Sequence, residues 1–248
     1  MKRLELIQFN SFKTYPNLIQ AFTTRKGGFS QGSYASLNMG VSVGDDPLVV
    51  SKNRELFFEN ISVPENRLVY PQQIHSNHTK QVSEPATINA CDALITREKN
   101  LFLTVQTADC FPVFMFDPDQ LCVGLVHSGW RGCAGNIIGR TIREMQQLGS
   151  NPQHLLIGIG AGIQQANYQV DQEVARQFDP VYLKADGHGR YKLNLQAVIL
   201  DQIIAEGVPV ENIECLNLCT FDREDLFYSY RRDGQKSGRM MGLIGIKG

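Results

Sequence analysis

Short runs of apolar residues without strand-like alternation limit what this chain can fold into more than any other feature. They occupy residues 101–106, 113–116, 121–127, 155–159 and 240–246. Runs of this length are typical of strands that are buried on both faces. They come in clusters of two or three between segments with helical spacing, and not in a regular strand–helix alternation. The pattern predicts an α+β fold.

The spacing of apolar residues elsewhere completes the set of expected elements. Helices are predicted at 51–58, 134–148, 171–178 and 194–206, and further strands at 18–23, 67–72, 93–96, 213–218 and 226–230. No internal repeat and no linker-like stretch rich in Pro or Gly divides the chain. We therefore expect a single domain over residues 1–248.

The charge balance excludes several classes of partner. The 248 residues carry a formal net charge of −1, whereas a surface that binds nucleic acid needs clustered Lys and Arg. No apolar run is long enough to span a bilayer. The first residues, MKRLELIQFN, lack the apolar segment of a signal peptide. We expect a cytoplasmic protein that has neither nucleic-acid nor membrane partners.

The six cysteines are expected to be reduced. They lie at positions 91, 110, 122, 133, 215 and 219, and no CxxC pair occurs. A large chain that is not secreted rarely uses disulfides. Because free cysteine is among the most buried residue types, most of these thiols should be small core side chains.

Cys110 and two histidines depart from this pattern. Cys110, His127 and His75 each stand where an apolar strand is expected to break into a turn. One thiolate and two imidazoles make a good ligand set for Zn²⁺, with the fourth position left open. The same residues also fit a cysteine nucleophile, with His127 as its base and Asp109 as an orienting or proton-holding group. Spacing alone does not separate the metal ligand from the nucleophile.

Three glycine-containing turns carry arginines that could bind an anion. Arg25 lies in TTRKGGFSQG and Arg131 lies in SGWRGCAGN, while SYRRDGQKSGR holds Arg231, Arg232 and Arg239. Free backbone N–H groups and a helix start near Arg131 favour negative charge. None of these turns matches the Walker phosphate-binding loop.

Seven stretches together resemble one known family. They are TTRKGGFS (23–30), SLNMG (36–40), QQIHS (72–76), DALIT (92–96), TADCFPV (107–113), VHSGWRG (126–132) and SYRRDG (229–234). In this respect the chain is similar to the YfiH family, also called laccase-domain or polyphenol oxidase-like proteins, from about residue 20 to its end. The resemblance implies an α+β fold of sandwich-like mixed sheets flanked by helices, similar in topology to the cysteine-hydrolase domain of a bacterial toxin.

The resemblance also implies an activity and a ligand set. His75, Cys110 and His127 match the zinc ligands of the family. Members are described as zinc-dependent enzymes that phosphorolyse adenosine, inosine, guanosine and methylthioadenosine and deaminate adenosine. The expected small-molecule partners are therefore purine nucleosides and phosphate, for a monomer or small homo-oligomer.

Roles for the neighbouring residues follow from this expectation. Asp109 is the candidate for proton delivery, or alternatively a residue that holds its own turn by local hydrogen bonds. Arg25 is the first candidate for binding phosphate and Arg231 the second. Asn38 and Gln72 are candidate polar contacts to the substrate.

One departure and three competing functions remain. The family turn GPCI is replaced here by GAGI at 160–163, which touches no proposed metal ligand. A copper-dependent polyphenol oxidase is one alternative, although the chain has five histidines and no HxH pair. A cysteine hydrolase, or a factor that edits cell-wall peptidoglycan precursors, is the second. A non-catalytic factor that acts through a partner is the third.

Overall fold

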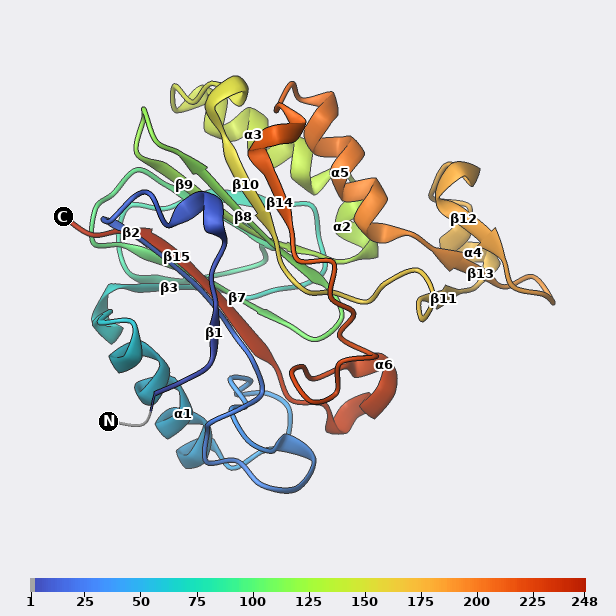
Figure 1. Ribbon diagram of the computed structural model, residues 1–248, viewed down its shortest axis with the longest axis horizontal. Coiled ribbons are helices and arrows are strands. Elements are labelled where there is room, and N and C mark those ends of the chain that lie inside the picture. Colours follow the sequence, from blue (N-terminus) through green and yellow to red (C-terminus); the bar gives the residue numbers. More distant parts are fainter. Residues whose placement is uncertain (1–2) are drawn as a thin grey trace.

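The computed structural model describes residues 3–248, so the first two residues of the predicted 1–248 domain lie outside the described residues. Two six-stranded sheets pack face to face, and helices cover their outer faces (Figure 1). This arrangement confirms the predicted α+β class with mixed sheets flanked by helices. No helix within 3–248 is long and apolar enough to cross a membrane.

The first sheet contains both termini of the folded chain. In spatial order its strands are β1 (Leu6–Ile7), β2 (Leu18–Thr23), β15 (Met240–Ile246), β7 (Phe102–Thr107), β3 (Leu68–Pro71) and β5 (Ala86–Ile88). β15 pairs antiparallel with β2 and β7, whereas β3 pairs parallel with β7 and β5. The sheet is therefore mixed, and its central strand is the last segment of the chain.

The second sheet is built around the β8–β9 hairpin. In spatial order its strands are β14 (Ile213–Cys215), β10 (Leu156–Ile159), β8 (Phe111–Asp117), β9 (Cys122–Ser128), β6 (Ala93–Thr96) and β4 (Thr79–Gln81). Every residue of β8 and β9 is buried. Burial on both faces explains why these strands read as continuous apolar runs in the sequence.

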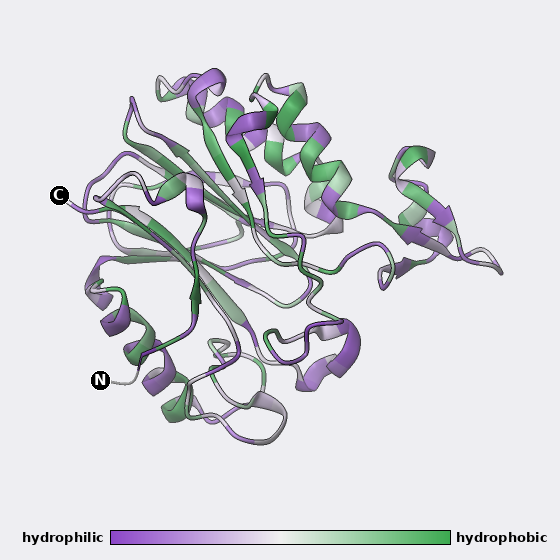
Figure 2. Cartoon of the chain, viewed as in Figure 1, coloured by the Kyte–Doolittle hydropathy of each residue, from purple (hydrophilic) through white to green (hydrophobic). Residues whose placement is uncertain are grey.

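Three apolar layers hold the sheets and helices together. Aromatic residues such as Phe22 and Phe114 fill the space between the two sheets. The helices α3 (Ile137–Gln147) and α5 (Leu195–Ala205) cover the outer face of the second sheet, and α1 (Pro47–Asn60) covers the first. Figure 2 shows hydrophobic residues along the central strands and hydrophilic residues along much of α1.

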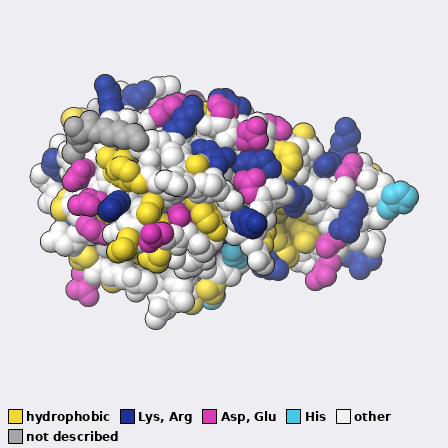
Figure 3. Space-filling model, turned by 90° about the horizontal axis from the view of Figure 1, so that it is seen from below, with side chains coloured by type: hydrophobic (Ala, Val, Ile, Leu, Met, Phe, Trp, Pro, Cys, Tyr) yellow, Lys and Arg dark blue, Asp and Glu magenta, His cyan; other side chains and the backbone are white. Residues whose placement is uncertain are grey.

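A smaller lobe projects from one side of this sandwich. It contains a three-stranded sheet of β11 (Gln169–Val170), β13 (Tyr191–Leu193) and β12 (Leu183–Ala185), together with α4 (Gln172–Ala175). Figure 3 shows the lobe standing out from the main body, with charged side chains of both signs on its surface.

The predicted helix at 134–148 corresponds to α3 and begins later than predicted, because residue 134 still belongs to a separate short helix. α2 (Trp130–Ala134) ends before Gly135, and α3 begins after Asn136. Asn136 has a positive φ of 54°, and its side chain accepts a hydrogen bond from the N–H of Gly139. A left-handed residue cannot continue a helix, so the chain turns there and a new helix starts.

The predicted strand at 226–230 is wrong. The residues Leu226 to Ser229 are buried but form no strand ladder, and α6 (Tyr230–Asp233) begins directly after them. The backbone N–H of Tyr228 donates to the Met240 sulfur, 3.1 Å away, in place of a strand partner. A short apolar run shows burial, but it does not show whether a neighbouring strand edge is available.

We expect Phe114→Ala to lower the free energy of unfolding by about 3–5 kcal/mol, because it leaves a cavity between the sheets. Phe114 is fully buried, and its ring centroid lies 5.5 Å from that of Phe9. Urea unfolding followed by circular dichroism measures the change. Leu48→Ala is the control, since Leu48 is 73% exposed and its loss should cost less than about 0.5 kcal/mol.

Candidate metal centre

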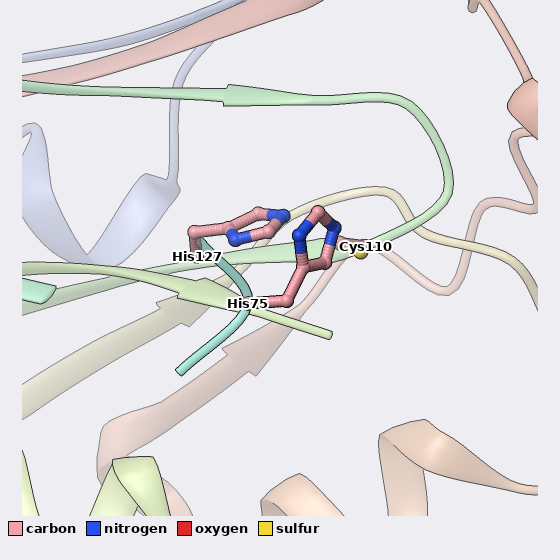
Figure 4. Close-up of side chains that lie close together, drawn as sticks. All are labelled: His75, Cys110 and His127. Carbon is pink, nitrogen blue, oxygen red and sulfur yellow. The ribbon is translucent and has the colours of Figure 1, made fainter. Parts of the chain in front are cut away.

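His75, Cys110 and His127 meet at one point, although they come from three separate segments. Their ligand atoms all lie within 4.8 Å of one another. Figure 4 shows the two imidazole rings beside the Cys110 sulfur, and the ring centroids of the histidines are 5.0 Å apart. Cys110 immediately precedes β8, His127 belongs to β9, and His75 lies in the loop after β3.

Strand register brings the cysteine to His127. In the antiparallel β8–β9 pair, Pro112 is opposite His127, so the residues just before β8 reach the His127 end of β9. Gly129 then makes room for the thiol. A Cβ atom at Gly129 would lie 2.9 Å from the Cys110 sulfur, which is closer than real contacts allow. Glycine is therefore required beside this cysteine.

A buried aspartate, Asp92, fixes both histidines. One carboxylate oxygen lies 2.9 Å from Nδ1 of His127 and also accepts from the N–H of His75 at 3.0 Å. The other accepts from the N–H of Ser76 at 2.6 Å and from its hydroxyl at 2.8 Å. The N–H of Ile74 donates to it as well, at 3.3 Å. Asp92 is fully buried and joins the His75 loop to the His127 strand.

The electrostatics of the group favour a thiolate. Burial raises the pKa of Cys110, but the charge and hydrogen bonds of His127 and His75 outweigh it and lower the pKa to about 6. Burial also opposes protonation of His127, yet Cys110 and Asp92 raise its pKa to about 9. For Asp92, burial is outweighed by His127 and Ser76, so that its pKa is lowered to about 2. The site therefore favours charges of both signs, on the half-buried Cys110 and on the buried His127 and Asp92.

This donor set fits a metal ion. A soft thiolate with two imidazoles suits Zn²⁺ or a copper ion, and three protein ligands leave a position free. Because His127 uses Nδ1 toward Asp92, its Nε2 remains for a metal, which is the usual arrangement of a ligating histidine. His75, Cys110 and His127 are thus a group that could hold a metal ion.

In metal-free protein, we expect the alkylation rate of Cys110 by iodoacetamide to rise as pH increases through about 6 and then to level off. The reason is that the thiolate is the reactive form, and its pKa is lowered to about 6. Burial raises the pKa of Cys122 to about 11, so this thiol should stay slow. Peptide mass spectrometry reads both sites. A Cys110 midpoint near the ordinary thiol value of about 8.5 would contradict the expectation.

A cavity of about 1130 Å³ opens beside the three ligands. Of the predicted site residues, it is lined by His75, Cys110, His127, Asp109, Gln72 and Arg231. Several aromatic side chains also line it, namely Tyr70, Trp130, Tyr168 and Tyr230. Such a mixture of aromatic walls and a few converging polar groups is typical of a small-molecule site.

The structure places Arg25, the first candidate for binding phosphate, outside the lining of this cavity. Its Nε donates to the carbonyl of Ala35 at 2.9 Å, and its Nη1 donates to the carbonyl of Glu224 at 3.1 Å. The guanidinium also lies 4.7 Å from the ring centroid of Tyr228. Arg25 therefore joins separate chain segments, and it lines a smaller pocket together with Arg232.

Asn38 is also absent from the cavity lining, because its side chain is fully buried and used in the framework. Its Oδ1 accepts from the N–H of Gly40 and the N–H of Arg239, both at 2.9 Å. Its Nδ2 donates to the Asp45 carboxylate at 2.9 Å. In this structure the Asn38 side chain supports the backbone of a neighbouring arginine, Arg239.

Asp109 lines the cavity and connects distant segments. One oxygen accepts from the hydroxyl of Thr220 at 2.7 Å, and the other accepts from the backbone N–H of Arg231 at 2.6 Å. These partners lie more than a hundred residues away in sequence, so its bonds are not the local turn bonds that were one of the two expectations. Asp109 fastens the Cys110 turn to the start of α6.

The unusual GAGI turn does not face the cavity except at its last residue. Ala161 is fully buried in the layer between the sheets, and Ile163 lines the cavity. A Cβ atom at Gly162 would lie 2.6 Å from the Phe111 ring, so this position packs against β8 too closely for a larger residue. The departure from the family pattern therefore alters the packing behind the site.

Sequence reasoning missed three residues that matter here. Asp92 immediately precedes the buried strand β6 and begins the DALIT stretch (92–96), but no role was predicted for it. Arg239 was noted only as a turn cation, and Arg54 was not considered, yet both line the cavity. A polar residue at the edge of an apolar run was the signal that could have found Asp92.

Comparisons with known proteins agree with this geometry. A family model described as multi-copper polyphenol oxidoreductase laccase matches residues 19–247. The chain is 38% identical to a purine nucleoside phosphorylase of Corynebacterium glutamicum, over 91% of this chain and 93% of that protein. It is 34% identical to the purine nucleoside phosphorylase YlmD of Bacillus subtilis, over 93% and 89% of the two chains.

Solved structures show the same fold. The crystal structure of YlmD from Geobacillus stearothermophilus superposes with a TM-score of 0.93 at 30% identity and covers 100% of both chains. A Bacillus licheniformis protein, YfiH, gives 0.92 at 31% identity, over 100% of this chain and 97% of that one. The predicted resemblance is confirmed: the chain belongs to the multi-copper polyphenol oxidoreductase laccase family, the YfiH-like proteins.

Proposed function

We propose that this protein is a zinc-dependent purine nucleoside enzyme that phosphorolyses nucleosides and also deaminates adenosine. The observation that carries the proposal is the convergence of His75, Cys110 and His127 on the wall of one large cavity. Relatives at 34% and 38% identity are named purine nucleoside phosphorylases, which supports an enzyme of that kind. Zinc bound by the three residues would supply Lewis acidity and make a bound water more acidic.

Phosphorolysis requires the protein to hold two reactants in line. A phosphate oxygen forms a bond to C1′ while the bond from C1′ to N9 of the purine breaks, and the base leaves with the bond electrons and gains a proton. Positioning both reactants supplies much of the rate enhancement in such a reaction. We assign Trp130 and Tyr168 to stacking on the purine, since both line the cavity beside the ligands.

Adenosine deamination needs a proton carrier rather than phosphate. Water adds at C6, and ammonia leaves after it receives a proton. We keep Asp109 as the proposed carrier, because its carboxylate lines the cavity and is held by Thr220 and Arg231. Gln72 and Arg231 remain proposed polar contacts to the substrate, since both line the same cavity.

The product profile tests this function. Purified protein is incubated with adenosine, with and without phosphate, and the products are separated by chromatography. Adenine with ribose 1-phosphate marks phosphorolysis, and inosine marks deamination. Zinc-loaded and copper-loaded samples are compared with chelated protein, and an oxidation assay with a phenol is run in parallel. Absence of any product from adenosine, inosine and guanosine in every metal form would refute the proposal.

A cysteine hydrolase is the second candidate, favoured by one observation. The pKa of Cys110 is lowered to about 6, against the effect of burial, by the neighbouring His127 and His75, which is what a nucleophilic thiol needs. Hydrolysis of amide or peptidoglycan-precursor substrates by metal-free protein, and its loss on alkylation of Cys110, would support this candidate. Activity that requires metal would exclude it.

A further inference from the structure

Two arginines on the cavity wall have no acidic partner. Arg54 comes from α1, Arg239 directly precedes β15, and both line the cavity. Both are only partly exposed. Within residues 3–248, neither guanidinium forms an ion pair with an Asp or Glu carboxylate. They are therefore two partly desolvated positive charges without a paired carboxylate, although Glu65 acts on the pKa of Arg54, and Cys110 and Asp109 act on that of Arg239.

A single residue, Met39, connects the chain segments that carry the two arginines, through the side chain of Arg54 and the backbone of Arg239. Its carbonyl accepts from Nε of Arg54 at 3.0 Å and from Nη2 at 2.8 Å. Its N–H donates to the carbonyl of Arg239 at 3.0 Å. The side chain of Asn53, the neighbour of Arg54 on α1, donates to the carbonyl of Asn38, and Asn38 accepts from the N–H of Arg239. These buried groups thus join the backbone at Arg239 to the helix that carries Arg54.

Each arginine keeps donors that these hydrogen bonds do not use. Nη1 of Arg54 has no hydrogen bond to any residue in 3–248, and Arg239 uses only Nη1, on the carbonyls of Ser237 and Gly238. Tyrosine rings lie against both, with Arg54 at 5.2 Å from the Tyr70 centroid and Arg239 at 5.8 Å from that of Tyr230. The buried Tyr70 hydroxyl also has no partner among the described residues.

The charges that line the cavity also favour an anionic ligand. Its lining contains Arg54, Arg131, Arg231 and Arg239 but a single carboxylate, Asp109, whose two oxygens already accept hydrogen bonds. Burial lowers the pKa of both Arg54 and Arg239, which reflects the cost of keeping them charged there. That cost falls when an anion with several acceptor oxygens binds, and phosphate matches the planar guanidinium fork.

We propose that Arg54 and Arg239 form a binding subsite for a phosphoryl dianion within the cavity. The inference rests on the proposed function, in which phosphate is a co-substrate, and it assigns the phosphate contact to a pair other than Arg25. The dianion has two possible sources with the same chemistry: free orthophosphate, or the 5′-phosphate of a purine nucleotide.

The test measures binding by the full-length, metal-loaded protein. Isothermal titration calorimetry gives the Kd for orthophosphate, and separate titrations compare AMP with adenosine in phosphate-free buffer. Arg54→Gln and Arg239→Gln are each expected to raise the Kd of the phosphoryl ligand about 10- to 100-fold, the effect of losing a charged hydrogen bond. If orthophosphate is the natural occupant, the Gln variants lose affinity for orthophosphate. If a purine nucleotide is the natural occupant, the wild-type protein binds AMP more tightly than adenosine, and the Gln variants lose that preference.

Two control variants at other arginines, and two Lys variants of the proposed pair, accompany this test. Arg140→Gln removes an exposed arginine of α3 that pairs with Glu144, and Arg25→Gln removes the arginine beside the smaller pocket. Both should bind the phosphoryl ligand as the wild type does. Arg54→Lys and Arg239→Lys keep the charge but lose the fork, so they should recover part of the affinity and remain folded if the Gln variants do not.

Binding that stays within about twofold of wild type in both Gln variants would overturn the subsite. So would a loss that appears in Arg25→Gln instead. Because calorimetry needs no turnover, a phosphoryl ligand that binds through Arg54 and Arg239 in a protein without nucleoside activity would retain the subsite and reject the proposed function. Nucleoside activity together with unchanged phosphate binding in both Gln variants would retain the proposed function and reject the subsite.

Discussion

Cys110→Ala is expected to release the metal and to lower the rate of nucleoside turnover at least about 1000-fold, the scale of removing one member of a group that acts as a unit. The thiolate is one of only three ligand atoms in the group, and the two imidazoles left behind cannot complete a tetrahedral site. Elemental analysis by mass spectrometry gives the metal content, and the adenosine assay gives the rate.

Cys122→Ala is the matched control for this change. Cys122 is a fully buried thiol at the other end of the same hairpin, opposite Asp117, and it belongs to no metal-binding group among the described residues. Its variant should lose a little stability and keep its metal and its activity. Stoichiometric metal in Cys110→Ala would remove the cysteine from the ligand set.

The second large effect is expected from Asp92→Asn, which should weaken metal binding about 10- to 100-fold. Every group around the Asp92 carboxylate is a donor: three backbone N–H groups, the Ser76 hydroxyl and Nδ1 of His127. An amide nitrogen in this place would face a donor, so either the His75 loop or the His127 ring must move. Competition with a chromogenic chelator measures the affinity.

Asp117→Asn separates this effect from a loss of buried hydrogen bonds in general. Asp117 is also fully buried, at the far end of β8, and it accepts from the N–H groups of Asp119, Gln120 and Asn151. Both variants should be less stable to urea, but only Asp92→Asn should bind metal more weakly. Equal metal affinity in the two variants would show that Asp92 does not position the ligands.

The sequence predicts which segments are buried better than it predicts which of them pair as strands. The strands at 18–23 and 93–96 have the predicted bounds, because most of their residues are buried and therefore apolar. The segment at 226–230 is equally apolar and forms no strand. Whether an apolar segment joins a sheet depends on a free strand edge, which is a property of the assembled fold.

The candidate site shows the same limit. Cys110 and His127 could be singled out because each ends an apolar run, but the spacing did not show that they meet. The β8–β9 register brings them together. Arg54 gave no such signal, since an arginine on a helix ordinarily faces water, and only the packing of α1 beside Met39 turns it toward the cavity.

The metal ligands are divided between the two sheets, since His75 follows a strand of the first and His127 belongs to the second, while Cys110 lies on the connection between them. A group distributed in this way cannot form in a half-folded chain. We therefore expect a metal ion to be bound only after the two sheets have docked, and to stabilise the docked state. The bound ion should slow the separation of the sheets more than it speeds their assembly.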